Sequence, residues 1–242
     1  FQKMINQGMI QAEDGQKMSK RYGNVVNPDD VIADYGADTL RLHEMFLGPI
    51  EQHKPWNTKG IEGVHRFLKK YWRLTHAKEG FEISEEAPTE KELKALHKAI
   101  KKVTDDNSRF AFNTVVSTLM VCVNELTELS CNKRAIIEPL TILMSPHCPY
   151  ITQEIWTKMG CEGYVKDAAL PTCEEKYLVE SVHKYPISFN GKMRFVLEID
   201  ANLGKEEVEK LVLSHEQTQK YIDGKTIRKV IVVPKKIVNV VV

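Results

Sequence analysis

Residues 112–126 read FNTVVSTLMVCVNEL, and their pattern indicates the fold class of the 242-residue chain. Apolar side chains recur there with the helical period and line one face: Phe112, Val115, Val116, Leu119, Met120, Val123 and Leu126. The same period runs from Lys59 to about Gly160. It predicts an antiparallel bundle of about four or five helices joined by short polar loops.

The other bundle helices follow from the same spacing. We expect them at about residues 59–78, 89–107 and 149–159. Proline is favoured in the first turn of a helix, where its missing N–H would be unpaired in any case. A further helix is therefore predicted to start near Pro139 and to end at Ser145-Pro146.

After about residue 182 the pattern becomes that of strands. Asn190-Gly191 separates two apolar runs and predicts a hairpin, because a type I′ turn needs positive φ at both central residues. A short helix at 204–213 and strands at 227–233 and 237–241 complete a small α+β module.

Residues 1–57 are rich in loops. Asn27-Pro28 predicts a helix start, and a second short helix should follow, capped by Asp38 and ended by Gly48-Pro49. The chain enters patterned sequence directly at Phe1, so we expect it to be the C-terminal part of a longer protein.

Composition narrows the classes of protein and partner. The 34 basic and 33 acidic residues leave a net charge of +1, so attraction to nucleic acid must come from local patches. The five cysteines include no C-x-x-C pair, which favours reduced thiols, a cytoplasmic protein and no metal site. No apolar run approaches the roughly 20 residues of a membrane span, so we expect no membrane partner.

Lys17-Met18-Ser19-Lys20-Arg21 is the stretch that most clearly suggests chemistry. Two lysines three positions apart in a glycine-flanked loop can bring two ammonium charges to one polyphosphate. The alternative is a solvated basic turn, since lysine pairs in loops are common.

The wider run from Lys17 to Leu42, KMSKRYGNVVNPDDVIADYGADTLRL, resembles the signature region of class I aminoacyl-tRNA synthetases. That family has KMSKS, then N-x-x-x-P and Y-G-A-D-x-x-R. Arg21 stands where the motif has serine, which removes a small hydroxyl from the loop. The resemblance implies that the loop closes over ATP, with its Mg²⁺, and that Lys17 and Lys20 are catalytic. Lys17, Met18, Ser19 and Lys20 would then bind ATP.

Further stretches are similar to bacterial leucyl-tRNA synthetases: residues 42–74, LTILMSPHCPYITQEIW at 140–156, FNGKMRF at 189–195 and residues 220–242. The resemblance implies a mainly α chain of three parts. These are the end of a catalytic domain at 1–57, an anticodon-binding helical bundle at 58–180, and a small tRNA-binding α+β domain at 181–242.

The resemblance implies that the intact protein ligates leucine to tRNA-Leu with the use of ATP. It implies no DNA partner. His-x-Gly-His, the family's other signature, does not occur among the eight histidines, and there is no inserted editing domain. We therefore expect this chain to be inactive alone. A valyl or isoleucyl ligase fragment and a non-catalytic tRNA-binding module are the alternatives.

Two basic sets are candidates for tRNA contact. Arg66, Lys69, Lys70 and Arg73 fall on one stripe of the predicted 59–78 helix, where the alternative is a solvated face. The second set lies in the last module, where lysines can instead protect strand edges from aggregation. Its members are Lys192, Arg194, Lys225, Arg228, Lys229, Lys235 and Lys236.

Overall fold

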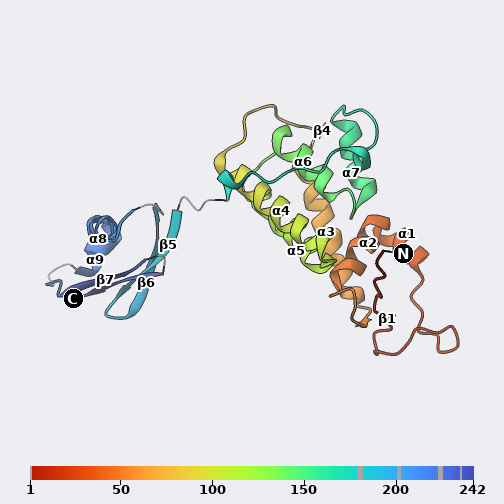
Figure 1. Ribbon diagram of the computed structural model, residues 1–242, viewed down its shortest axis with the longest axis horizontal. Coiled ribbons are helices and arrows are strands. Elements are labelled where there is room, and N and C mark those ends of the chain that lie inside the picture. The colour runs from red at the N-terminus through yellow and green to blue at the C-terminus, as the bar shows by residue number, and fades with distance from the viewer. Residues whose placement is uncertain (1, 179–181, 201–202, 223–225, 235) are drawn as a thin grey trace. The chain divides into compact units, whose positions relative to one another are not determined.

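The computed structural model describes residues 2–178, 182–200, 203–222, 226–234 and 236–242. The chain divides into two compact units, residues 1–178 and 179–242, and each has its own hydrophobic core (Figure 1). The first unit is helical and the second contains a four-stranded sheet. The prediction of a mainly helical chain with a small sheet is confirmed.

The first unit begins with a short parallel pair, β1 (Ile10–Gln11) and β2 (Lys54–Pro55). Gly8 packs so closely against the backbone of Gln52, just before β2, that a Cβ atom there would clash with the Gln52 carbonyl oxygen. Helices α1 (Pro28–Tyr35) and α2 (Ala37–Phe46) follow. The predicted start at Asn27-Pro28 is confirmed, since Asn27 Oδ1 accepts the Asp29 N–H at 3.2 Å.

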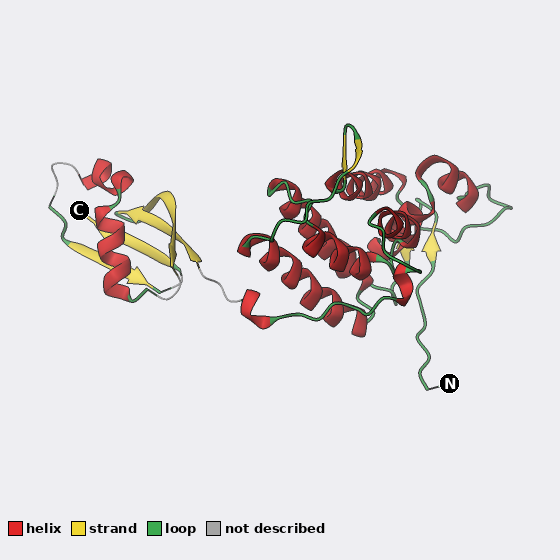
Figure 2. Cartoon of the chain, turned by 90° about the horizontal axis from the view of Figure 1, so that it is seen from above, coloured by secondary structure: helices red, strands yellow, loops and turns green. Residues whose placement is uncertain are grey.

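Five longer helices form the bundle, and α3 to α5 lie side by side in both views (Figures 1 and 2). Their bounds agree with the predicted ranges to within a few residues, except at the start of the fourth. They are α3 (Thr58–Leu74), α4 (Glu90–Ser108), α5 (Phe112–Glu128), α6 (Arg134–Met144) and α7 (Pro149–Lys158).

The prediction that the fourth helix starts near Pro139 is wrong. Helix α6 starts at Arg134 and contains Pro139 in its interior. The extra turn buries Ile136 and Ile137 completely. Burying two such side chains stabilises by about 3 to 6 kcal/mol, which matches or exceeds the roughly 3 kcal/mol that an interior proline costs.

Short elements surround the bundle. Helix α3 ends at Leu74, before the predicted end, and a hairpin of β3 (His76–Ala77) and β4 (Gly80–Phe81) follows. Two 3₁₀ turns, η1 (Val165–Asp167) and η2 (Glu175–Tyr177), lie in the segment after α7. On α5 the predicted apolar face is buried, although Phe112 and Met120 are only half-buried.

The second unit is a sheet in the order β6-β5-β8-β7, with helices on one face (Figure 2). The central strands β5 and β8 are parallel, and both edge strands pair antiparallel. Asn190 and Gly191 have φ of 49° and 79°, which confirms the predicted hairpin. The second helix, α9, was not predicted. The elements are β5 (Val182–Phe189), β6 (Lys192–Asp200), α8 (Lys205–Ser214), α9 (Glu216–Ile222), β7 (Lys229–Val233) and β8 (Ile237–Val241).

Candidate functional site

The loop that carries Lys17 and Lys20 is closed by one side chain, Asn24. Its Oδ1 accepts the Ser19 N–H at 2.8 Å and its Nδ2 donates to the Lys17 carbonyl oxygen at 3.4 Å. Both lysine side chains are exposed, and neither has an ion-pair partner among the described residues. The loop therefore offers two free ammonium groups, three positions apart, to a bound anion.

Arg21 plays no part in closing the loop through its side chain. Its N–H donates to Ser19 Oγ at 3.2 Å, while its guanidinium is exposed and without a hydrogen bond in the described structure. The hydroxyl that the loop uses belongs to Ser19. The absence of serine at position 21 consequently removes none of these hydrogen bonds.

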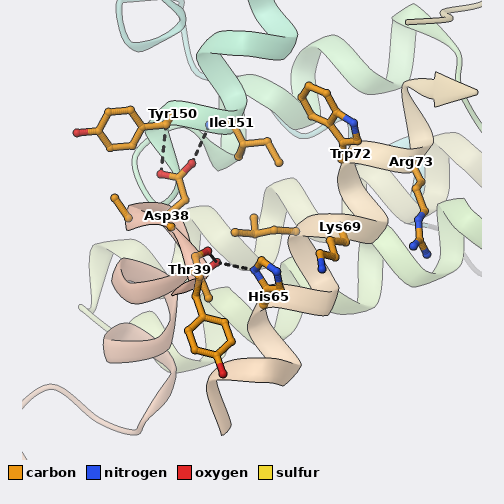
Figure 3. A pocket seen from close by; sticks show the side chains of 12 residues that line it. Asp38, Thr39, His65, Lys69, Trp72, Arg73, Tyr150 and Ile151 are labelled. Atoms are coloured by element: carbon orange, nitrogen blue, oxygen red, sulfur yellow. Dashed lines mark hydrogen bonds between the residues drawn. The ribbon is translucent and has the colours of Figure 1, made fainter. Parts of the chain in front are cut away.

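The expectation that Asp38 caps α2 is wrong, because the N-cap of α2 is Gly36. The Asp38 carboxylate instead accepts the N–H groups of Tyr150 at 3.2 Å and Ile151 at 2.7 Å in the first turn of α7 (Figure 3). Burial raises the pKa of Asp38, against these two hydrogen bonds and the charge of Arg41, which lower it. Tertiary packing thus gives this carboxylate a helix N-terminus 112 positions away along the chain.

A second bond from α2 reaches the same corner. Arg41 Nη2 donates to the Pro146 carbonyl oxygen at 3.1 Å, in the turn between α6 and α7. Asp38 and Arg41 therefore hold α2, the second helix after the lysine loop, against both sides of that turn.

All four cations of the predicted stripe on α3 are exposed. Arg66 lies 3.6 Å from Glu62, and Lys70 Nζ donates to Asn124 Oδ1 at 2.8 Å. Lys69 and Arg73 have no hydrogen-bond or ion-pair partner among the described residues. The structure thus divides the stripe into two engaged cations and two available ones.

Lys69 and Arg73 also line a pocket of about 600 Å³ between α2, α3 and α7 (Figure 3). Tyr35, Trp72 and Tyr150 contribute aromatic rings to it. The motifs and helical faces visible in the sequence singled out neither of the two tyrosines. The available signal was that Tyr150 lies outside the apolar phase of its helix, and its exposed fraction is 69%.

In the second unit Lys192, Arg194, Arg228, Lys229 and Lys236 are exposed. The Asn190 N–H donates to the Val240 carbonyl oxygen at 3.0 Å, which puts the hairpin turn beside the end of β8 that pairs with Lys229. Lys192 and Arg194 therefore share one end of the sheet with Arg228 and Lys229.

Lys236 follows the far end of β7, about 15 Å away at the usual rise per residue. Lys225 and Lys235 lie outside the described residues.

The described residues contain no group of three or more His, Cys, Asp and Glu side chains that could hold a metal ion. None of the described helices is both long enough and apolar enough to cross a membrane. Burial raises the pKa of Cys122 to about 12 and that of Cys131 to about 11, so neither thiol is activated as a nucleophile.

Comparison with known proteins identifies the family. Residues 1–54 match the model of class I tRNA synthetases (I, L, M and V), and residues 91–210 match the anticodon-binding domain of tRNA ligase. The leucine–tRNA ligase of Christiangramia forsetii is 58% identical over 226 residues, which are 93% of this chain and 24% of that protein. The chain belongs to the leucine–tRNA ligase family.

Other leucine–tRNA ligases agree with this assignment. That of Cytophaga hutchinsonii is 56% identical over 93% of this chain and 25% of its own length. That of Porphyromonas gingivalis is 54% identical over 94% of this chain and 24% of its own length. The chain thus spans about a quarter of the length of these curated relatives. Neither the valyl and isoleucyl alternatives nor the non-catalytic module is favoured.

A solved leucyl-tRNA synthetase supports the fold. The crystal structure of the Agrobacterium radiobacter K84 LeuRS in a ternary complex with tRNA and LeuAMS aligns with 98% of this chain and 32% of its own, at a TM-score of 0.67 and 26% identity.

Proposed function

We propose that this chain is the part of a leucine–tRNA ligase that supplies the ATP loop and surfaces for tRNA-Leu. The intact enzyme would join leucine to ATP as leucyl-adenylate, release pyrophosphate, and transfer the leucyl group to the 3′ end of the tRNA. The enzyme would act in the cytoplasm. This chain alone would be inactive. The observation that carries this proposal is the exposed pair Lys17 and Lys20 on a hydrogen-bonded loop, in a chain whose relatives are leucine–tRNA ligases.

The role of the loop follows from electrostatics. When the leucine carboxylate attacks the α-phosphate, negative charge develops on the departing pyrophosphate. Ammonium groups placed beside that charge stabilise the transition state more than the ground state. In this proposal Lys20 supplies the main charge and Lys17 the second, while Met18 and Ser19 shape the loop. Mg²⁺ would accompany the ATP.

Substitution of Lys20 by alanine in the full-length ligase tests the proposal. We expect leucine-dependent pyrophosphate exchange to fall by about 10²- to 10³-fold, with tRNA affinity unchanged. Lys78→Ala is a matched control, because Lys78 is an exposed lysine at the β3–β4 turn. An unchanged exchange rate in the Lys20→Ala variant would contradict the role of the loop.

The tRNA surface in this proposal comprises the α3 stripe of Arg66, Lys69, Lys70 and Arg73 together with the basic set of the second unit. The exposure of those members that the structure describes, and the single sign of their charge, support it. Equilibrium binding of this chain to tRNA-Leu and tRNA-Val over a range of salt concentrations tests it. Tighter, salt-sensitive binding to tRNA-Leu is expected, and equal or absent binding would contradict recognition by these surfaces.

A further inference from the structure

The pocket between α2, α3 and α7 has no role in the chemistry proposed for the lysine loop. Its volume of about 600 Å³ lies in the range of sites that bind small organic groups. Tyr35, Leu68, Trp72 and Tyr150 give it a largely apolar and aromatic lining. It is therefore suited to a flat, mainly apolar group.

The polar groups deep in the pocket already have partners. Asp38 accepts two N–H groups from α7, and His65 Nδ1 lies 3.3 Å from Thr39 Oγ1 (Figure 3). Asp38 is the only acid that lines the pocket within the described structure. A ligand there would not have to compete with these internal hydrogen bonds.

The charge available to a ligand is positive. Lys69 and Arg73 lie one helical turn apart on α3, and both line the pocket. They are also the two stripe residues without a partner among the described side chains, whereas Glu62 and Asn124 engage Arg66 and Lys70. The pocket therefore combines aromatic walls with two unneutralised cations.

A planar base joined to a phosphate has the chemistry that complements such a pocket. We infer that it takes an unpaired stretch of the bound tRNA, with one base against the Tyr150 ring on one side of the pocket and a phosphate beside Lys69 and Arg73 on the other (Figure 3). A free nucleotide has the same chemistry. The RNA is favoured because the two cations continue into Arg66 and Lys70, a stripe longer than one phosphate needs. This inference rests on the proposed tRNA binding.

Tyr150 is the best residue for a test, because its ring is exposed and its bond to Asp38 uses only the backbone N–H. In the full-length ligase, Tyr150→Ala should weaken binding of tRNA-Leu by about 5- to 100-fold, the effect of losing one stacked base. Tyr150→Phe keeps the ring and should bind within about twofold of wild type. Tyr164→Ala, a change at another exposed tyrosine of the same unit, should do the same.

Two further measurements distinguish other occupants. Hydroxyl-radical footprinting of the wild-type ligase should show Tyr150 protected only when tRNA is present. Protection without tRNA would mean that a polypeptide segment covers the pocket, and would overturn the inference. Nucleoside monophosphates at millimolar concentration should not bind through Tyr150. If they do bind there, and the Tyr150→Ala substitution leaves the affinity for tRNA unchanged, the site is one for a free nucleotide and the inference is overturned.

The results also separate this inference from the proposed function. Equal tRNA binding by wild type and Tyr150→Ala overturns the pocket assignment alone. Absence of tRNA binding by the wild-type ligase overturns the proposed function and the pocket assignment with it.

Discussion

His147 shows how burial sets the charge of a single side chain. It is 3% exposed, and burial lowers its pKa to about 4, with the charge of Arg41 adding to the effect. One neutral tautomer satisfies both neighbours: Nδ1–H can donate to Met45 Sδ at 3.4 Å, and Nε2 can accept from Asn107 Nδ2 at 3.5 Å. A protonated ring would lose the second interaction.

The shift at His147 predicts a loss of stability in acid. The unfolded histidine binds a proton near pH 6.5 and the folded one near pH 4, so the unfolded state binds more protons between these values. The contribution to the free energy of unfolding is lost as the pH falls, by about 2 kcal/mol between about pH 7 and pH 5. Urea unfolding of wild type and His147→Gln at both pH values checks this. A variant with the full pH dependence of wild type would contradict it.

Substitution should lower the activation rate at one residue of the lysine loop and leave it nearly unchanged at another. Asn24→Ala removes both side-chain bonds that close the loop, and we expect leucine activation by the full-length ligase to fall about tenfold. Arg21→Ser changes a side chain that makes no hydrogen bond in the described structure, so the rate should stay within about twofold. Pyrophosphate exchange measures both. The reverse order would show that the guanidinium, and not the Asn24 amide, organises the loop.

At the scale of elements, the joint between α2 and α7 depends on Asp38. Asp38→Ala leaves two N–H groups in the first turn of α7 without their acceptor, and should lower the free energy of unfolding by about 1 to 2 kcal/mol. Asp34→Ala removes an exposed carboxylate from α1 and should change it by less than about 0.5 kcal/mol. Urea unfolding measures both variants, and equal effects would contradict the joint.

The start of α4 permits a second test of capping. Thr89 Oγ1 accepts the Glu92 N–H at 3.3 Å, and Glu92 Oε2 accepts the Thr89 N–H at 2.5 Å and pairs with Lys133 at 3.0 Å. Burial by itself would raise the pKa of Glu92. The hydrogen bonds together outweigh burial, so the pKa of Glu92 lies below its ordinary value. Thr89→Ala should destabilise the chain by about 1 kcal/mol in thermal or urea unfolding. An unchanged midpoint would show that the Lys133 pair alone holds this helix end.

At the scale of the whole molecule, a net charge of +1 means that RNA affinity depends on where cations gather. The test variant changes Arg66, Lys69, Lys70 and Arg73 together to glutamine. The slope of the logarithm of the tRNA-Leu binding constant against the logarithm of the salt concentration should then become less steep, by up to about 0.7 for each phosphate contact that is lost. A control changes four exposed lysines elsewhere, Lys78, Lys91, Lys98 and Lys205, and should leave the slope unaltered. Equal slopes for both variants would show that the α3 stripe is a solvated face that makes no contact with tRNA phosphates.

Features set by neighbouring residues followed from the sequence. The apolar period of 112–126 predicted α5, and Asn190-Gly191 predicted the hairpin between β5 and β6, because each depends on bonds within one helix or one turn. The lysine loop and the stripe on α3 were also visible, since a motif and a helical face are local patterns. The start of α6 was not, because the burial of Ile136 and Ile137 outweighs the preference of Pro139 for a first turn.

The pairings between residues far apart in the sequence depend on tertiary packing. Asp38 reaches α7 across 112 positions, and Asn124 engages Lys70 across 54, which leaves Lys69 and Arg73 available beside Tyr150. Such contacts depend on how helices pack against one another, and the spacing of residues within one helix carries no information on that. The sequence therefore determined most of the helices, the hairpin and the charges, while packing determined where α6 starts, which charges remain available and where a pocket opens.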